Sequence, residues 1–544
     1  GARASGRVLG LRSRVLDSTT ESFGIRSLAW DASFGLRLNG KPITLRGGCV
    51  HHDNGPLGAA TIDRAETRRV ELLKANGYNA IRTSHNPVSP AFLAACDRLG
   101  MLVMDEAFDC WSGGKNSADY HLDFDSWWRR DLAAMVLRDR NHPSVIMWSI
   151  GNEIPIRASP LGYNLSAQLA AFVRARDPSR RPVTSAYPGP DEHADPYFAH
   201  LDIAGYNYSP QQYAPDHARL PARLIVATES FPADSYDYWQ AVWAHAWVVG
   251  DFVWTALDYI GESAIGNAAY TSDADPLGAC FTDDRRATSW SWHTAYCGDL
   301  DICGFKKPQS HYRNVLWGLS GLEVVTHDPT PPGATEHVSS WGWPNEEVSW
   351  TWPGAEGEPL TVKAYTWQPN VTLLLDGRVV GRAGGSDLAR LTASFVVPFA
   401  AGNLTVIAHG GAGPPRVKTL LTAGSAAALH MSADRESICA SRDDLAYVTV
   451  QVVDRAGRML PRAQLPISFA LSGSAAELYR VGNGDPQDLG SFTAPRRSTF
   501  RGRALAVLRP VAAGFTGQVR LSATAPGLRP ASLVVRIDPA ACDV

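Results

Sequence analysis

Two glutamates in this sequence of 544 residues each follow a short apolar run. Glu153 ends the stretch that begins at Val145, and Glu229 ends the stretch that begins at Leu224. Apolar runs this short, bounded by polar loops, are typical of strands buried on both faces. Parallel β/α folds place their chemistry at the carboxyl ends of such strands. The two glutamates therefore indicate paired carboxylates, which are the usual equipment for cleaving a glycosidic bond.

Two carboxyl groups can cleave that bond with either stereochemical outcome. In a retaining enzyme, one protonates the leaving oxygen and the other attacks the anomeric carbon from about 5–5.5 Å away, whereas an inverting pair lies further apart to admit water. Asn152, next to Glu153, can donate a hydrogen bond to a sugar 2-hydroxyl. The alternative for either glutamate taken alone is a helix-cap or loop carboxylate.

An alternating series of strands and helices must position these groups. Eight strands are predicted at 43–52, 79–85, 102–108, 145–153, 182–187, 202–208, 224–230 and 251–259. Helices are predicted at 63–76, 89–99, 125–140, 161–176, 238–249 and 309–317. This series predicts a (β/α)₈ TIM barrel, in which strands four and seven face each other across the mouth and bring Glu153 and Glu229 together. The alternative, a doubly wound open sheet, needs a glycine-rich phosphate turn that Gly47-Gly48 does not provide.

Strand patterns dominate outside the predicted barrel at 29–322. Residues 1–28 alternate apolar and polar side chains, and we interpret them as the last strands of an incomplete immunoglobulin-like β-sandwich. Short β-rich segments separated by turns predict two further immunoglobulin-like β-sandwiches at 323–424 and 425–544. The predicted fold class is therefore multidomain: a barrel followed by two sandwiches and preceded by the tail of another.

Composition excludes several classes of partner. The net charge of −3 gives no electrostatic case for nucleic acid, and the absence of a long apolar run argues against membrane insertion. The eight cysteines include no Cys-x-x-Cys pair, which argues against a zinc or redox site. Cys297 and Cys303 are near enough for a loop disulfide, with two free thiols as the alternative.

Four tripeptides match the glycosylation pattern, which favours an extracellular or secretory-pathway location with the signal segment outside this chain. They begin at Asn164, Asn207, Asn370 and Asn403.

Five motifs in the predicted barrel, taken together, resemble glycoside hydrolase family 2, which contains β-galactosidases, β-glucuronidases and β-mannosidases. They are Asn141–Glu153 (the acid/base signature), Asn79–Pro87 (second strand), Leu102–Glu106 (third strand), Thr228–Ser230 (nucleophile strand) and Phe252–Tyr259 (eighth strand). They occur in the family's order between about residues 30 and 320. The predicted flanking sandwiches also fit the family's modular plan.

The resemblance assigns roles to individual residues. It implies that Glu153 is the acid/base and Glu229 the nucleophile, with Arg82 keeping the nucleophile ionised through a charge-assisted hydrogen bond. The substrate-binding residues that it implies are His51, Arg82, His85, Asn152, Tyr208 and Trp254. Tyr208 would bond the nucleophile, the histidines and Asn152 would bind sugar hydroxyls, and Trp254 would offer an indole face, with a purely core role as its alternative.

Departures from the family pattern narrow these expectations. Where some β-galactosidases carry a magnesium-binding carboxylate, this chain has Cys110, a poor ligand for a hard cation, so we expect no catalytic metal and no cofactor. No Asn-x-Lys clamp of the glucuronidase kind is evident. Family members begin with a jelly-roll domain that helps to close the pocket, so we expect a missing segment or a separate chain to supply that wall.

The leading hypothesis is a retaining exo-β-glycosidase that acts on a carbohydrate substrate, with β-galactosidase as the first choice. Alternatives are a β-glucuronidase, a β-mannosidase or an endo-acting relative. A different class of alternative is a non-catalytic glycan-binding or structural component that retains a glycosidase barrel. The oligomeric state, including a homo-oligomer, stays open.

Overall fold

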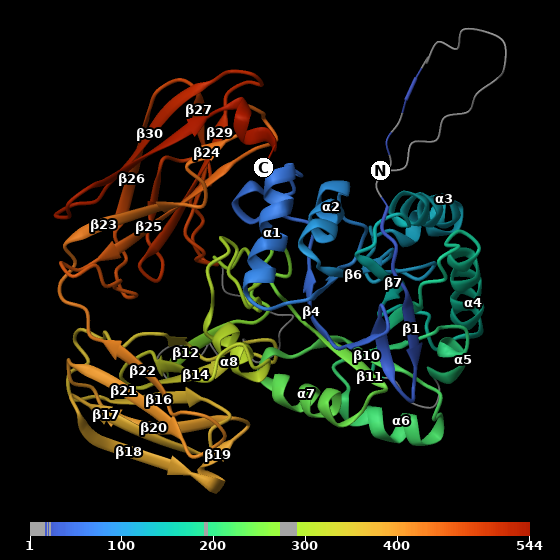
Figure 1. The fold of residues 1–544 in the computed structure, drawn as a ribbon, viewed down its shortest axis with the longest axis horizontal. Coiled ribbons are helices and arrows are strands. Elements are labelled where there is room, and N and C mark those ends of the chain that lie inside the picture. Colours follow the sequence, from blue (N-terminus) through green and yellow to red (C-terminus); the bar gives the residue numbers. More distant parts are fainter. Residues whose placement is uncertain (1–16, 19, 21–22, 190–193, 273–290, 544) are drawn as a thin grey trace. The chain divides into compact units, whose positions relative to one another are not determined.

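The computed structural model describes residues 17, 18, 20, 23–189, 194–272 and 291–543. Within them, eight parallel strands close a barrel in the order β10-β11-β4-β5-β6-β7-β8-β9 (Figure 1). These strands are β4 (Leu45–Val50), β5 (Ala80–Thr83), β6 (Leu102–Glu106), β7 (Val145–Asn152), β8 (Val183–Pro188), β9 (Ala204–Asn207), β10 (Ile225–Ser230) and β11 (Val248–Val253). The closed barrel confirms the predicted fold class and excludes the open doubly wound sheet.

The chain forms two compact units, and each contains part of the barrel. The first comprises residues 1–44, 85–226 and 245–249, and the second comprises 45–84, 227–244 and 250–544. The first unit contains strands β6–β9 and five helices among its described residues: α2 (Pro90–Leu99), α3 (His121–Asp139), α4 (Pro160–Arg174), α5 (Asp195–Phe198) and α6 (Tyr213–Arg219). The second unit contains β4, β5, most of β10 and β11, the helices α1 (Asp63–Ala75), α7 (Ser235–Ala244) and α8 (Pro308–Leu316), and two β-sandwiches.

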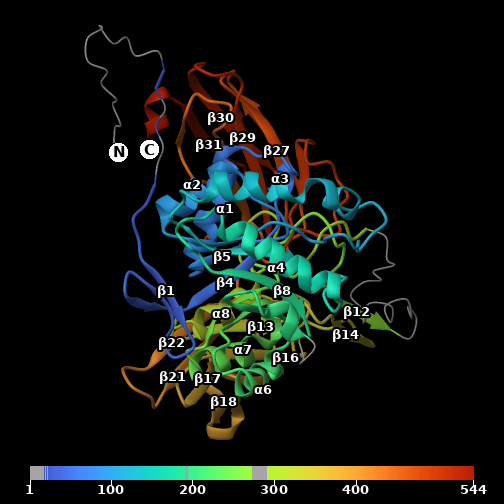
Figure 2. The ribbon, with the colours of Figure 1, turned by 90° about the vertical axis from the view of Figure 1, so that its right-hand side faces the viewer.

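Two helices of the first unit, α2 and α4, begin at serine caps. Ser89 Oγ accepts a hydrogen bond from Phe92 N at 3.1 Å ahead of α2, and Ser159 caps α4 in the same way. Helix α3 begins before the predicted residue 125 because the Asp119 carboxylate accepts a bond from His121 N at 3.0 Å. Helices α3 and α4 lie side by side (Figure 2).

The predicted boundary between the helix at 238–249 and the strand at 251–259 is wrong. Helix α7 ends at Ala244 instead of residue 249, because Val248 and Val249 already belong to β11. A turn in which Val248 N donates to His245 O at 3.1 Å separates the two elements. β-Branched valines fit a buried strand better than a helix end, so β11 starts earlier and ends at Val253. The segment from Trp254 onward therefore lies outside the strand.

The adjacent glycines in β4 are needed for packing. A Cβ atom on Gly47 would lie 2.3 Å from the Phe252 ring, and one on Gly48 would lie 2.6 Å from the Ala256 side chain. Only glycine allows this close approach between neighbouring barrel segments. The Gly-Gly pair is thus explained by the packing of the barrel.

Two β-sandwiches follow the barrel, each built from two sheets around its own apolar core (Figure 1). The sheets of the first run β15-β13-β16-β20-β19 and β18-β17-β21-β22, from β13 (Glu323–His327) to β22 (Arg416–Leu421). The sheets of the second run β23-β25-β29-β27 and β24-β31-β30-β26-β28, from β23 (Ala428–Ala433) to β31 (Ala531–Ile537). Buried side chains alternate with exposed ones along β20 (Thr392–Pro398) of the first sandwich and β30 (Gly517–Thr524) of the second, as a sheet with one buried face requires.

The cysteine chemistry differs from the favoured expectation. Cys297 and Cys303 are free and buried, so the alternative of two thiols holds for them. A disulfide instead joins Cys439 and Cys542 across the second sandwich, over a sequence separation of 103 residues. Sequence reasoning missed it because partners this distant leave no spacing pattern.

The amino-terminal strands predicted at 1–28 are covered only in part. The stretch from Val8 to Val15 lies outside the described residues, and Phe23–Arg26 forms no regular element. A three-stranded antiparallel sheet follows, made of β1 (Leu28–Asp31), β2 (Gly35–Leu38) and β3 (Lys41–Ile43). Across the described part of the chain, no helix combines the length and apolar character needed to cross a membrane.

Candidate active site

Glu153 leaves the barrel at the carboxyl end of β7, a strand that is buried throughout. The pairing of β7 with β8 slips between Ser149 and Asn152, which marks an irregularity at the strand end. Glu153 then adopts a left-handed backbone with φ of 45°, and its N–H donates to Ala186 O at 2.9 Å. This conformation is uncommon for a residue with a side chain, and such conformations cluster at functional sites.

Asn207, at the end of β9, holds the Glu153 carboxyl group. Its Nδ2 donates to Glu153 Oε1 at 3.0 Å and lies 3.2 Å from Asn152 Oδ1. Asn207 is 0% exposed, so its glycosylation tripeptide is not accessible in the fold. Sequence reasoning missed this contact, although the position at the end of a buried strand was a signal.

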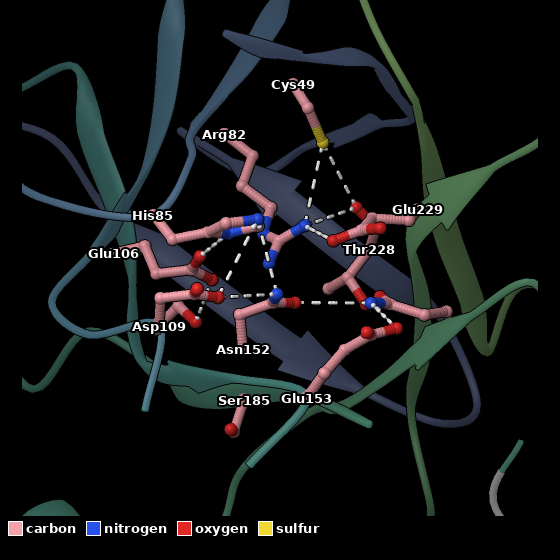
Figure 3. A network of polar contacts seen from close by, with 12 residues as sticks. Cys49, Arg82, His85, Glu106, Asp109, Asn152, Glu153, Ser185, Thr228 and Glu229 are labelled. Atoms are coloured by element: carbon pink, nitrogen blue, oxygen red, sulfur yellow. Dashed lines mark hydrogen bonds and ion pairs between the residues drawn. The ribbon is translucent and has the colours of Figure 1, made fainter. Parts of the chain in front are cut away.

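A hydrogen-bond chain in the first unit orients Asn152 and His85 (Figure 3). Asn152 Nδ2 donates to Asp109 Oδ1 at 3.0 Å and lies 3.2 Å from His85 Nε2. On the other side of the ring, His85 Nδ1 lies 2.6 Å from Glu106 Oε1, and Ser149 Oγ donates to Glu106 Oε2 at 2.7 Å. The contacts on its two ring nitrogens fix the orientation of the His85 ring between Glu106 and Asn152.

Asp109 is a member of this chain that the sequence did not single out. Lys115 Nζ lies 2.6 Å from its Oδ1 atom. Burial opposes the charge on Asp109, but the neighbouring His85 and Lys115 and the bonds from Lys115 and Asn152 lower the pKa of this carboxyl group below its usual range. Asp109 therefore acts as an ionised acceptor that keeps the Asn152 amide in place.

Glu229 lies in the second unit, where Arg82 from β5 contacts it (Figure 3). Arg82 Nη1 lies 2.8 Å from Glu229 Oε1 and 3.0 Å from Thr228 O. Arg82 is 0% and Glu229 4% exposed, so the ion pair is shielded from water. The contact predicted between these two residues is present. It supplies a fixed positive charge next to the carboxylate.

Cys49, at the end of β4, completes the arrangement around Arg82. Its Sγ donates to Thr228 O at 3.3 Å and lies 3.6 Å from Arg82 Nη1. Burial raises the pKa of the Cys49 thiol to about 12, and therefore the thiol stays protonated as a donor. The sequence had given this cysteine no role.

His51 and Trp254 lie together in a cluster of rings in the second unit. The His51 ring stacks on Tyr259 with centroids 4.0 Å apart and meets Trp254 edge-on at 5.3 Å. Trp254 is only 3% exposed, and a cis peptide bond joins it to Thr255. Most of the indole surface is therefore covered by neighbouring side chains. This burial agrees with the core role that the sequence left open for Trp254.

Two further positions bear on the sequence expectations. Tyr208 directly follows β9 in a left-handed conformation with φ of 53° and is half-buried. Cys110 is buried, and its Sγ donates to Asp119 Oδ1 at 3.3 Å. Among the residues that the structure describes, no group of three or more His, Cys, Asp or Glu side chains is arranged to hold a metal ion.

Three family models match separate parts of the chain. Residues 33–213 match the TIM barrel domain of glycosyl hydrolases family 2, and residues 429–534 match C-terminal domain 5 of glycoside hydrolase family 2. Residues 357–414 match a domain of unknown function. The matches thus cover most of the barrel and part of each sandwich.

Individual relatives agree with these matches. A beta-galactosidase of Bacteroides ovatus, BoGH2A, is 30% identical over 96% of this chain and 64% of its own length. A putative beta-glucuronidase of Formosa agariphila is 26% identical over 91% of this chain and 48% of its own length. The crystal structure of a glycosyl hydrolase family 2 member from Bacteroides cellulosilyticus superimposes with a TM-score of 0.87 and 40% identity, covering 95% of this chain and 65% of that one. The chain thus spans about half to two thirds of the length of these relatives.

Proposed function

Because the chain belongs to glycoside hydrolase family 2, we propose that it carries the catalytic barrel of a retaining exo-β-glycosidase whose preferred terminal sugar is β-galactose. One observation carries the proposal. Each glutamate at a barrel strand end has a buried polar partner that suits its chemical role, since Arg82 contacts Glu229 and Asn207 contacts Glu153.

The proposed reaction has two displacements. In the first, an oxygen of Glu229 forms a bond to the anomeric carbon, the bond from that carbon to the leaving oxygen breaks, and the Glu153 carboxyl proton passes to the leaving group. In the second, Glu153 takes a proton from water while the water oxygen attacks the anomeric carbon and releases Glu229. This chemistry requires the two carboxyl groups to lie about 5–5.5 Å apart.

The surrounding residues suit these steps. Arg82 donates to Oε1 of Glu229, which supplies a fixed positive charge next to the attacking carboxylate. Asn207 donates to Glu153 Oε1, so the acid proton is placed on Oε2. Asn152 and His85, oriented by Asp109 and Glu106, are suited to bind sugar hydroxyls.

The choice of sugar rests on two arguments. The relative BoGH2A is named as a beta-galactosidase, and the Asn-x-Lys tripeptide of this chain, Asn39-Gly40-Lys41, lies at the turn between β2 and β3, outside the barrel strands. Hydrolysis of 4-nitrophenyl β-galactoside, β-glucuronide and β-mannoside, with a β-linked polysaccharide as an endo-substrate, separates these alternatives. We expect the galactoside to have the highest kcat/KM. If the glucuronide or the mannoside has the highest kcat/KM instead, the proposed sugar is wrong, but the proposed mechanism is unaffected.

The roles of the two glutamates are tested by alanine variants with added azide. For Glu229→Ala, we expect loss of turnover of roughly 10⁴-fold or more and, with azide, formation of the α-glycosyl azide, because azide attacks in place of the nucleophile. For Glu153→Ala, we expect the β-glycosyl azide, because azide then intercepts the glycosyl-enzyme. Glu356→Gln, on an exposed turn of the first sandwich, is the matched control.

A 2-fluoro-β-galactoside, followed by peptide mapping, should label Glu229. Turnover that persists in Glu229→Ala, or a label on another residue, would contradict the assignment. Absence of turnover by the unmodified protein on every β-glycoside from acid to neutral pH would favour the non-catalytic glycan-binding alternative. We further propose that a jelly-roll domain, supplied by a further segment or by a separate chain, helps to close the pocket. These assays therefore use the longest natural form of the protein.

We also propose that the protein works in an oxidising compartment, outside the cell or along the secretory route. The disulfide between Cys439 and Cys542 supports this location, since disulfides persist mainly in such compartments. Thiol alkylation of the protein taken directly from its native source tests it. Labelling of Cys439 and Cys542 without prior reduction would contradict the proposal.

A further inference from the structure

A segment between β13 and β15 (Glu346–Glu347), outside the two sheets of the first sandwich, contributes an aromatic ring next to the strand that carries Glu229. Trp341 follows β14 (Ala334–Val338), and its ring centroid lies 5.2 Å from that of Phe231 at an interplanar angle of 69°. Phe231 is the first residue after β10, and it lies two positions beyond Glu229. Both rings are half-buried. A ring from a domain outside the barrel thus contacts the loop that begins at the nucleophile strand.

The segment that carries Trp341 is anchored to the barrel half of the second unit. Strand β14 pairs antiparallel with β12 (Ala268–Ser272), which lies between β11 and α8 in the chain. Beyond β14, Ser339 N donates to Asn267 O at 3.0 Å, and Asn345 Nδ2 donates to Ala268 O at 3.2 Å. Hydrogen bonds on both sides of Trp341 therefore hold the turn in one place.

Close packing further restricts this turn. A Cβ atom on Gly342 would lie 2.7 Å from Asn267 O, so only glycine permits the observed approach. The neighbouring Trp343 has a different role, because its Nε1 donates to Glu346 Oε2 at 2.9 Å and its ring lies 5.6 Å from that of Tyr312. Trp343 therefore connects β15 to α8, whereas Trp341 contacts the loop after β10.

We propose that Trp341, together with Phe231, forms the binding surface for the leaving-group part of the substrate, and that this part is a second sugar ring or an aryl ring. This inference rests on the proposed function. In a barrel enzyme the reacting sugar is held at the strand ends, and the leaving group extends outward past the loops. An indole face packs well against the C–H face of a pyranose or against an aryl ring. Trp341 and Phe231 are specificity-determining residues in this arrangement.

Leaving groups with and without a ring distinguish this role from simple packing. Glycosyl fluoride delivers the same sugar to Glu229 but releases an ion that cannot contact an aromatic surface. Aryl glycosides and disaccharides release a ring. A residue that binds the leaving group therefore changes the ratio of kcat/KM between the two kinds of substrate, whereas a residue that only stabilises the fold changes both equally.

The experiment measures kcat/KM of the wild type, Trp341→Ala and Trp341→Phe on β-galactosyl fluoride, 4-nitrophenyl β-galactoside and a β-linked galactosyl disaccharide. For Trp341→Ala, we expect the ratio of the ring-bearing substrates to the fluoride to fall about ten-fold. Trp341→Phe should restore most of it, because a phenyl face remains. The matched control is Trp367→Ala, which removes a 52% exposed indole from the first sandwich. An unchanged ratio in Trp341→Ala would overturn the proposal.

A binding measurement separates failure of this inference from failure of the proposed function. Phenyl and methyl 1-thio-β-galactoside resist hydrolysis, so calorimetric titration reports their binding whether or not the protein is an enzyme. We expect Trp341→Ala to weaken binding of the phenyl compound about ten-fold more than binding of the methyl compound. Equal effects on both compounds, or none, would reject Trp341 as a leaving-group contact. Absence of turnover in the wild type would reject the catalytic proposal alone.

Discussion

Asn207 Nδ2 donates a hydrogen bond to Glu153 Oε1 at 3.0 Å, from a side chain that is fully buried. The same nitrogen lies 3.2 Å from Asn152 Oδ1, so one amide connects the acid/base candidate to the residue that precedes it. Asn207 is thereby a positioning residue for both side chains. Its tripeptide matches a glycosylation signal, yet its place at the end of β9 gives it a role inside the barrel.

Substitution of Asn207 by alanine should weaken acid catalysis most. Without its amide, Glu153 loses the donor that fixes its orientation, so we expect kcat/KM to fall roughly 10- to 100-fold for leaving groups that need protonation. The loss should be small for 2,4-dinitrophenyl glycosides, whose leaving group departs without a proton. The slope of log kcat/KM against leaving-group pKa measures the difference. The control is Asn164→Ala, at an exposed asparagine of α4, and an equal loss across all leaving groups would contradict the role.

Substitution of Arg82 by lysine should impair the nucleophile although the charge is kept. Arg82 Nη1 contacts both Glu229 Oε1 and Thr228 O, and the shorter lysine side chain cannot bring its ammonium to the same place. We expect kcat/KM to fall about 100-fold, which corresponds to roughly 3 kcal/mol of lost transition-state stabilisation.

Chemical rescue provides the sharper measurement for this position. Guanidinium added to Arg82→Ala should restore part of the activity, because the ion can occupy the vacated site next to Glu229. The control is Arg378→Lys on the exposed side of β18 (Arg378–Gly384). Full activity of Arg82→Lys would show that the ion pair is dispensable.

Asp251 makes the stability of the protein depend on pH. Burial in β11 raises its pKa to about 6, against the opposing effects of the Arg313 charge and of the bonds from Ser230 and Trp239. Between the ordinary value and about 6, the folded protein keeps a proton that the unfolded chain has released, so the free energy of unfolding falls as pH rises through this window. Asp251→Asn stays neutral, so we expect the variant to lack this decrease, which amounts to roughly 3 kcal/mol in the wild type.

Denaturant unfolding of the wild type and Asp251→Asn at pH values from 4 to 7 measures the effect. The difference in unfolding free energy should shift in favour of the variant as pH rises. Asp387→Asn, at an exposed turn, controls for the loss of one negative charge. A constant difference across the range would show that Asp251 does not titrate in this window.

The disulfide should stabilise the second sandwich. Cys439 follows β24 (Ser437–Ile438), and Cys542 follows β31. Closing a loop of about 100 residues lowers the entropy of the unfolded chain, which raises the free energy of unfolding by up to about 4.7 kcal/mol. In the double variant Cys439→Ser/Cys542→Ser, we therefore expect faster hydrogen exchange of the amides in β24 and β31. Amides of the first sandwich are the internal reference. Unchanged exchange in β24 and β31 would mean that their hydrogen bonds alone hold this edge.

Much of the barrel could be predicted because its signals are local. The stretch that ends at Glu153 forms β7 over Val145–Asn152, and the Ser89-Pro90 dipeptide starts α2 as expected. The prediction was wrong at the end of α7, where helix and strand patterns overlap within a few residues and tertiary pairing places Val248 in β11. The position of Asn207 at the end of a predicted strand was a signal for a site residue, but the pattern does not show which side chain of a neighbouring strand it contacts.

The sequence by itself determined the strand-end carboxylates, their order along the chain and the family to which those motifs belong, because periodicity and short motifs are encoded within a few neighbouring residues. Only the tertiary structure decided which side chains hold these carboxylates. The contacts of Arg82 with Glu229, of Asn207 with Glu153 and of Trp341 with Phe231 join residues that are far apart in the chain. Such contacts depend on strand order and packing, which place distant residues together and leave no trace in local spacing.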